Sequence, residues 1–151
     1  MKINEIFYSL QGEGFWTGTP AVFVRLSGCN LHCSFCDTLH ESGQSMSEEA
    51  IAQTVAQWPA RHVVITGGEP SLFLTPTLVE RLHAAGKFVA VETNGTHPLP
   101  DNVDWITLSP KDAFELHATP VLTRCDELKV VCDGTPPPTY PHLAATHRFL
   151  Q

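Results

Sequence analysis

Short apolar segments alternate with polar and glycine-containing turns along most of this chain. Between Ala21 and Leu26, the side chains of Val22, Val24 and Leu26 fall on one face and that of Arg25 falls on the other, as in a half-buried strand. Comparable apolar runs predict further strands at residues 5–10, 62–66, 87–92, 105–108 and 127–131.

A helical spacing of apolar residues separates several of these strands. The first helix is expected to begin at Ser45, with Glu48 completing a capping box, and to bury Ile51 and Val55. A second helix is predicted at residues 75–85, closed by Gly86, and a short third one at 140–148. This repeated order of strand and helix predicts an α/β fold whose parallel sheet is covered by helices.

Polar and glycine residues collect directly after the predicted strands. A cysteine-rich loop follows Leu26, and Gly67-Gly68-Glu69-Pro70 follows another strand. Thr93-Asn94-Gly95 and Ser109-Pro110-Lys111 follow two later ones. Because ligands of parallel α/β folds bind outside the carboxyl ends of the strands, we expect these four loops to meet at one rim.

The composition is that of a globular protein, with 42% hydrophobic and 17% charged residues in 151. This length predicts one domain, residues 1–151, with one core. The net charge of −7 argues against nucleic-acid binding, and no apolar stretch approaches the length of a membrane span. The segment Met1 to Glu5 does not resemble a signal peptide, so a cytoplasmic protein with reduced thiols is expected.

Three of the five cysteines lie close together, at Cys29, Cys33 and Cys36. Zinc sites and ordinary electron-transfer clusters take four protein ligands, whereas three thiolates on a four-iron cluster leave one iron open to an external molecule. A zinc site would need His32 as its fourth ligand, and that residue adjoins Cys33, where tetrahedral closure would be strained. The spacing therefore favours a cluster, with zinc or three structural cysteines as the alternatives.

The cysteine loop and the glycine turn together resemble the radical S-adenosylmethionine superfamily. The resemblance rests on Cys29, Cys33, Phe35 and Cys36, followed by Gly67-Gly68-Glu69-Pro70. It implies a [4Fe–4S] cluster whose open iron binds the amino and carboxylate groups of S-adenosylmethionine. It also implies a 5′-deoxyadenosyl radical that removes a hydrogen atom from the substrate, while the protein supplies orientation.

Further motifs narrow the resemblance to the 7-carboxy-7-deazaguanine synthase family. This family converts 6-carboxy-5,6,7,8-tetrahydropterin to 7-carboxy-7-deazaguanine with release of ammonia, on the route to queuosine and other 7-deazapurines, and it uses Mg²⁺. The resemblance implies a carbon–nitrogen lyase. The motifs, in chain order, are Tyr8 to Gly14, Phe23 to Leu26, Gly28 to Leu31, Cys36-Asp37-Thr38, Val91 to Thr96 and Ser109-Pro110-Lys111.

The same resemblance implies roles for individual residues. Cys29, Cys33 and Cys36 would bind the cluster, and Thr38 would bind Mg²⁺ through its oxygen. Arg25 would offer a forked cation to the substrate carboxylate. The expected S-adenosylmethionine site comprises Phe35, Cys36, Asp37, Gly68, Ser109, Pro110, Lys111 and Gln151. The expected pterin site comprises Leu10, Gln11, Gly12, Glu13, Arg25 and Thr66.

The resemblance also sets expectations for the whole molecule. It implies an incomplete, distorted (β/α) barrel with a mostly parallel sheet, a homodimer, and an electron donor such as flavodoxin or ferredoxin. The family continues beyond a Leu-Gln pair similar to Leu150-Gln151. A C-terminus that is short relative to the family, with one wall of the pocket open, is therefore expected.

Two other functions compete with the synthase. A glycyl-radical-enzyme activase shares the cysteine spacing, but the Gln11-Gly12-Glu13 turn and the Cys36-Asp37-Thr38 run argue against it. A non-enzymatic metal-binding module would need a fourth ligand and no glycine turn. Cys125 and Cys132 have no partner in spacing and are expected to be ordinary thiols.

Overall fold

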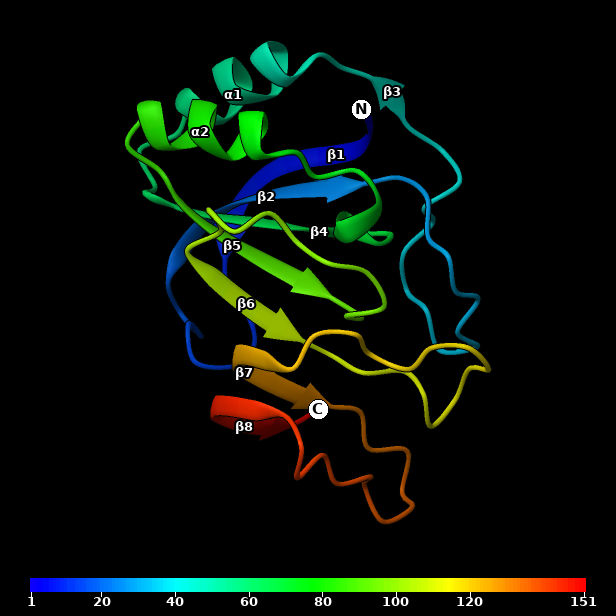
Figure 1. Cartoon of the computed structure of the whole chain (residues 1–151). Coiled ribbons are helices and arrows are strands. Elements are labelled where there is room, and N and C mark those ends of the chain that lie inside the picture. Colours follow the sequence, from blue (N-terminus) through cyan, green and yellow to red (C-terminus); the bar gives the residue numbers. More distant parts are fainter.

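Eight strands form one open sheet in the computed structural model of the chain, which describes residues 1–151 (Figure 1). The strand order is β3-β1-β2-β4-β5-β6-β7-β8, so β3 and β8 are the edges and the sheet does not close on itself. β1 is antiparallel to β2 and β3, and all other neighbours are parallel. An incomplete barrel with a mostly parallel sheet is confirmed.

The elements are β1 (Lys2–Leu10), β2 (Pro20–Leu26), β3 (Gln44–Ser45), α1 (Glu48–Ala56), β4 (His62–Gly67), the 3-10 turn η1 (Pro70–Leu72), α2 (Pro76–Ala84), β5 (Phe88–Thr93), β6 (Trp105–Leu108), β7 (Arg124–Val130) and β8 (Ala144–Leu150).

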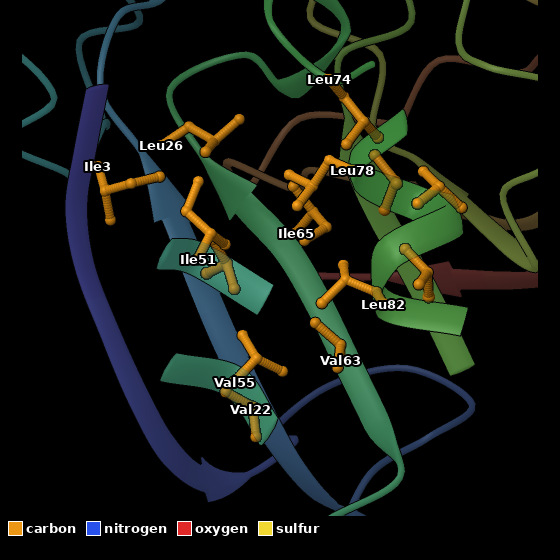
Figure 2. Packing of buried hydrophobic residues seen from close by; sticks show 14 of the residues in the cluster. Ile3, Val22, Leu26, Ile51, Val55, Val63, Ile65, Leu74, Leu78 and Leu82 are labelled. Atoms are coloured by element: carbon orange, nitrogen blue, oxygen red, sulfur yellow. The ribbon is translucent and has the colours of Figure 1, made fainter. Parts of the chain in front are cut away.

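The main core lies between the two helices and the outer face of β1, β2, β4 and β5 (Figure 2). Alternate residues of β4 divide between the two faces of the sheet. Val63 and Ile65 pack in the core with Leu78 of α2, whereas Val64 belongs to a small inner cluster with Phe23. This alternation follows from strand geometry and leaves the inner face free for other contacts.

The outer face of β6, β7 and β8 carries no helix. The loop between β7 and β8 covers it instead, through a smaller core that includes Leu108, Leu128, Tyr140 and Leu143. The Tyr140 hydroxyl donates a hydrogen bond to Asp112, which fastens this cover to the loop after β6.

The helix predicted at 140–148 is wrong. Residues Ala144–Leu150 form β8, which runs parallel to β7 with Arg124 opposite Ala144 and Val130 opposite Leu150. Pairing with β7 extends from Ala144 to Leu150 along one side of this edge strand, so the tertiary contact overrides the weak local signal.

The predicted start of the first helix is also wrong by two residues. Ser47 is the N-cap, and its Oγ accepts a hydrogen bond from the Ala50 amide at 3.1 Å. Ser45 belongs to β3, opposite Lys2 of β1. Glu48 accepts a hydrogen bond from the Thr75 hydroxyl, so it ties α1 to the N-cap of α2 and does not complete a capping box. No helix in the structure has the length and hydrophobicity of a membrane span.

Aromatic rings close the inside of the sheet at the amino ends of its strands. Trp16, from the β1–β2 loop, lies with its ring centroid 5.0 Å from His62 and 5.2 Å from Trp105. Phe15 stacks on His147 at 4.3 Å. The Glu127 side chain accepts a hydrogen bond from the Phe15 amide at 3.0 Å, which holds the loop in place. The opposite end, where the carboxyl ends of the parallel strands and the long loops lie, stays open (Figure 1).

Candidate active site

A cavity of about 650 Å³ opens at the carboxyl ends of the parallel strands. Residues from the β1–β2 loop, the cysteine loop, the β4–η1 turn and the ends of β5 and β6 line it, together with the inner face of β7. The four loops that sequence analysis placed at one rim therefore do meet there.

All but one of the residues predicted to bind the cluster, the cofactor, Mg²⁺ or the pterin line this cavity. The exception is Pro110, which is buried but does not line it. This shared location agrees with the assigned roles, which stay predictions. The lining residues among those predicted are Leu10, Gln11, Gly12, Glu13, Arg25, Cys29, Cys33, Phe35, Cys36, Asp37, Thr38, Thr66, Gly68, Ser109, Lys111 and Gln151.

The cysteine loop presents its three thiols to the cavity. The Leu31 amide donates to Cys29 Sγ at 3.4 Å, and the Cys36 amide donates to the Cys33 carbonyl at 3.0 Å. Burial raises the pKa of Cys29 and of Cys33, and nearby Lys111 acts in the opposite direction on Cys33. Iron binding would therefore have to displace thiol protons. His32 is exposed and lies outside the cavity lining.

The turn after β4 packs its backbone against the cysteine loop. A Cβ atom on Gly68 would lie 1.9 Å from the Gly28 carbonyl oxygen, so only glycine fits at position 68. The Glu69 amide donates to that same carbonyl at 2.9 Å. The glycine turn thus acts as the backing of the cysteine loop, a close approach that a side chain would prevent.

Glu69 braces the loops around the cysteines. It is 1% exposed. One carboxylate oxygen accepts from the Ser71 amide at 2.9 Å and the Thr93 hydroxyl at 2.6 Å, and the other accepts from the Asn94 amide at 2.8 Å. The Asn94 side chain then donates to Asn30 Oδ1 in the cysteine loop at 3.1 Å.

Arg25 joins β2 to the end of the cysteine loop. Its Nη1 donates to Thr38 Oγ1 at 3.1 Å, its Nε lies 3.1 Å from a Glu5 carboxylate oxygen, and its guanidinium lies 5.7 Å from the Phe7 ring centroid. The Thr38 hydroxyl donates to Asp37 Oδ1 at 3.2 Å. The side-chain oxygens of Thr38 and Asp37 therefore form an oxygen-rich corner of the cavity. This corner lies beside the Arg25 guanidinium, which is held over the Phe7 ring.

A second charged group, at the far side of the cavity, was not predicted from the sequence. Lys129 on β7 lies between Glu13 of the β1–β2 loop and Glu92 of β5, with nitrogen–oxygen distances of 3.0 Å and 3.4 Å. Gln11 and Thr66 donate to Glu92 at 3.1 Å and 3.0 Å. The available signal was a lysine at an interior position of an apolar strand, two residues after Glu127.

Comparisons with known proteins agree with this geometry. The sequence pattern of the radical SAM superfamily matches residues 23–122. The 7-carboxy-7-deazaguanine synthase of Bacteroides thetaiotaomicron is 57% identical over 150 residues, covering 99% of this chain and 80% of the relative. The synthase of Burkholderia multivorans is 45% identical, covering 85% and 70%. The chain belongs to the 7-carboxy-7-deazaguanine synthase family of radical SAM proteins.

A solved structure supports the same relationship at the level of the fold. The crystal structure of QueE from Escherichia coli superposes with a TM-score of 0.73 at 35% identity, over 85% of this chain and 68% of that one. The open sheet described above is thus the radical SAM fold of this family.

Membership in the radical SAM superfamily implies a [4Fe–4S] cluster and S-adenosylmethionine, and the cavity fits both. Three thiols face one cavity, but no three metal-binding side chains converge on a single point. That arrangement suits three separate irons of a cluster better than one zinc ion, which needs a tetrahedral set. Phe35, Ser109 and Lys111 line the same cavity as the cysteines, and Lys111 lies near enough to Cys33 to act on its pKa.

Proposed function

We propose that this chain is a 7-carboxy-7-deazaguanine synthase, which contracts the ring of 6-carboxy-5,6,7,8-tetrahydropterin with loss of ammonia. The proposal rests on one observation above all. The three cysteines and the predicted pterin residues Gln11, Arg25 and Thr66 line one continuous cavity. The names of the relatives favour this activity over a glycyl-radical activase or a metal-binding module. Loss of ammonia breaks a carbon–nitrogen bond, so the enzyme would be a carbon–nitrogen lyase.

In this proposal, the cofactors and the individual side chains have separate roles. When bound, the cluster and S-adenosylmethionine supply the 5′-deoxyadenosyl radical that begins the reaction. Cys29, Cys33 and Cys36 would hold the cluster, and Arg25 would pair with the pterin carboxylate. Gln11 can offer both a donor and an acceptor to the pterin edge. The aromatic rings around Trp16 fill the inside of the sheet at the amino ends of its strands, opposite the cavity rim.

The remaining groups are proposed on narrower grounds. The hydroxyl of Thr38 beside the Asp37 carboxylate offers Mg²⁺ the oxygen ligands it prefers, with substrate oxygens and water completing the shell. Residues 1–151 would act as one domain, in the cytoplasm, where the thiols stay reduced. A homodimer and a flavodoxin or ferredoxin as electron donor stay predictions from the family.

Anaerobic reconstitution with iron and sulfide tests the activity. We expect the reconstituted chain, given a reductant, S-adenosylmethionine, Mg²⁺ and carboxytetrahydropterin, to form 5′-deoxyadenosine and 7-carboxy-7-deazaguanine together. Removing Mg²⁺ with a chelator should lower the rate at which 7-carboxy-7-deazaguanine forms. Formation of neither product by a chain that carries its cluster would refute the proposal. A tightly bound zinc ion without iron–sulfur absorption would favour the metal-binding module.

Replacing Arg25 with alanine should weaken substrate binding specifically. A charge-assisted hydrogen bond to a carboxylate contributes about 2 kcal/mol, so the KM for carboxytetrahydropterin should rise by about 30-fold. The KM for S-adenosylmethionine should stay nearly constant. Arg124→Ala provides the matched control, because Arg124 is an exposed arginine outside the cavity. Equal KM values for the pterin in the two variants would show that Arg25 does not bind the substrate.

A further inference from the structure

Lys129 is a buried lysine at the inner face of β7. Its side chain is 6% exposed, and its ammonium lines the cavity between two carboxylates, 3.0 Å from Glu13 and 3.4 Å from Glu92. Burying a lone ammonium costs several kcal/mol, so an ion in this position depends on its partners. Burial alone would lower the pKa of Lys129, but Glu92 and Glu13 outweigh that effect and leave it above its ordinary value.

The two carboxylates extend this contact across the cavity. Gln11 and Thr66 each donate to Glu92, at 3.1 Å and 3.0 Å, and the Gln151 side chain donates to Glu13 at 3.0 Å. Lys129 therefore joins the β1–β2 loop to β4, β5 and the end of β8 through hydrogen-bonded side chains. Three of the residues contacted in this way, Gln11, Glu13 and Thr66, are ones that sequence analysis assigned to the pterin.

The other two strong cations of the cavity have different surroundings. Arg25 donates to Thr38 in the oxygen-rich corner, and Lys111 donates to Ser109 beside the cysteines. Lys129 alone has two carboxylates within 4 Å. Its charge is already balanced, so it is poorly suited to bind an anion and well suited to hold the two carboxylates.

We propose that Lys129 is a positioning residue for the pterin, acting through Glu13 and Glu92. Through its two ion pairs, the ammonium holds both carboxylates at the cavity wall. Their oxygens can then accept hydrogen bonds from the amino and ring N–H groups of a pterin, which are donors. This assignment rests on the proposed function and adds to it a residue that neither the sequence motifs nor the relatives indicate.

Removing the ammonium should affect pterin binding more than any other step. Without it, nothing balances the like charges of the half-exposed Glu13 and the partly buried Glu92, and we expect the two carboxylates to move apart. The KM for carboxytetrahydropterin in Lys129→Met should rise by at least about 30-fold, the lower end expected when one partner of a buried charge pair is lost. Lys129→Arg, which restores the charge, should recover most of this loss.

The test uses the full chain, reconstituted anaerobically, and measures five quantities. These are kcat and KM for carboxydeazaguanine formation, the affinity for the pterin by calorimetry, iron content, and 5′-deoxyadenosine formed without pterin. Lys87→Met is the matched control, because Lys87 is also buried but donates to the carbonyls of Trp58 and Ala60 outside the cavity. Lys129→Gln replaces Lys129→Met if the methionine variant does not fold.

The expected result is a weakened pterin affinity in Lys129→Met, with iron content and pterin-free cleavage as in the wild type, and no change in pterin KM for Lys87→Met. An unchanged pterin KM in Lys129→Met, or a parallel loss of kcat, pterin affinity, iron content and pterin-free cleavage that Lys129→Arg does not relieve, overturns the assignment alone. A wild-type chain that holds its cluster and forms no carboxydeazaguanine overturns the proposed function, and this assignment with it.

Discussion

Replacing Cys29, Cys33 or Cys36 with alanine is expected to abolish both 5′-deoxyadenosine and carboxydeazaguanine formation. All three cysteines line the same cavity, and no other cysteine lines it. A cluster with two protein thiolates would be held too weakly to survive reconstitution. Iron and sulfide content and the visible absorption of the purified variant provide the measurement.

The control for this experiment is the exposed thiol at position 132. Cys132 lies outside the cavity lining, so Cys132→Ala should keep its iron, its absorption and its activity. Cys125, in contrast, is buried in the core under the β7–β8 loop, and burial raises its pKa to about 11. A Cys36→Ala variant that retained full iron content and full activity would show that the cluster lies elsewhere.

The substitution Glu69→Gln is expected to have the second-largest effect. The carboxylate accepts three hydrogen bonds in a site that is 1% exposed, whereas a glutamine amide keeps one acceptor oxygen and turns an N–H group toward the Asn94 or Ser71 amide. Mispairing of this kind in a buried site should lower the free energy of unfolding by about 4 kcal/mol. The Asn94–Asn30 contact behind the cysteine loop should loosen with it.

Chemical denaturation and the KM for S-adenosylmethionine measure the two consequences separately. We expect the variant to unfold at lower denaturant and to need about tenfold more S-adenosylmethionine, because the loop that backs the cofactor is no longer fixed. Glu80→Gln serves as the control, since Glu80 is exposed on α2. Identical denaturation curves for the two variants would show that Glu69 does not brace these loops.

Most of the sheet could be predicted from local sequence patterns. The apolar runs of the strands and the polar and glycine residues of the following loops indicate the same strand boundaries. The strands around Val24, Ile65 and Val91 are runs of buried apolar residues, so their positions follow from the sequence. β8 was missed because its segment has little alternation of its own and becomes a strand only by pairing with β7. β3 was missed because two residues, Gln44–Ser45, carry too little signal to predict a strand.

The candidate site divides in the same way. The cysteines, the glycine turn and Arg25 lie in short runs with distinctive spacing, so they could be predicted. The contact between Lys129 and Glu92 could not, because these residues lie on β7 and β5, with β6 between them in the sheet. Their proximity depends on the curvature of the sheet, which no local pattern encodes. The bracing role of Glu69 likewise depends on donors supplied by a distant segment at Thr93 and Asn94.

The order of strands has a consequence for how the protein is made. From β2 onward, apart from the short β3, each strand pairs with the one before it in the chain, so the sheet can extend strand by strand as the polypeptide leaves the ribosome. Gly68 and Glu69 emerge soon after the cysteine loop, and the Glu69 partners Thr93 and Asn94 follow with β5, whereas Lys129 emerges only with β7. The half of the cavity that holds the thiols can therefore form before the wall that carries Lys129.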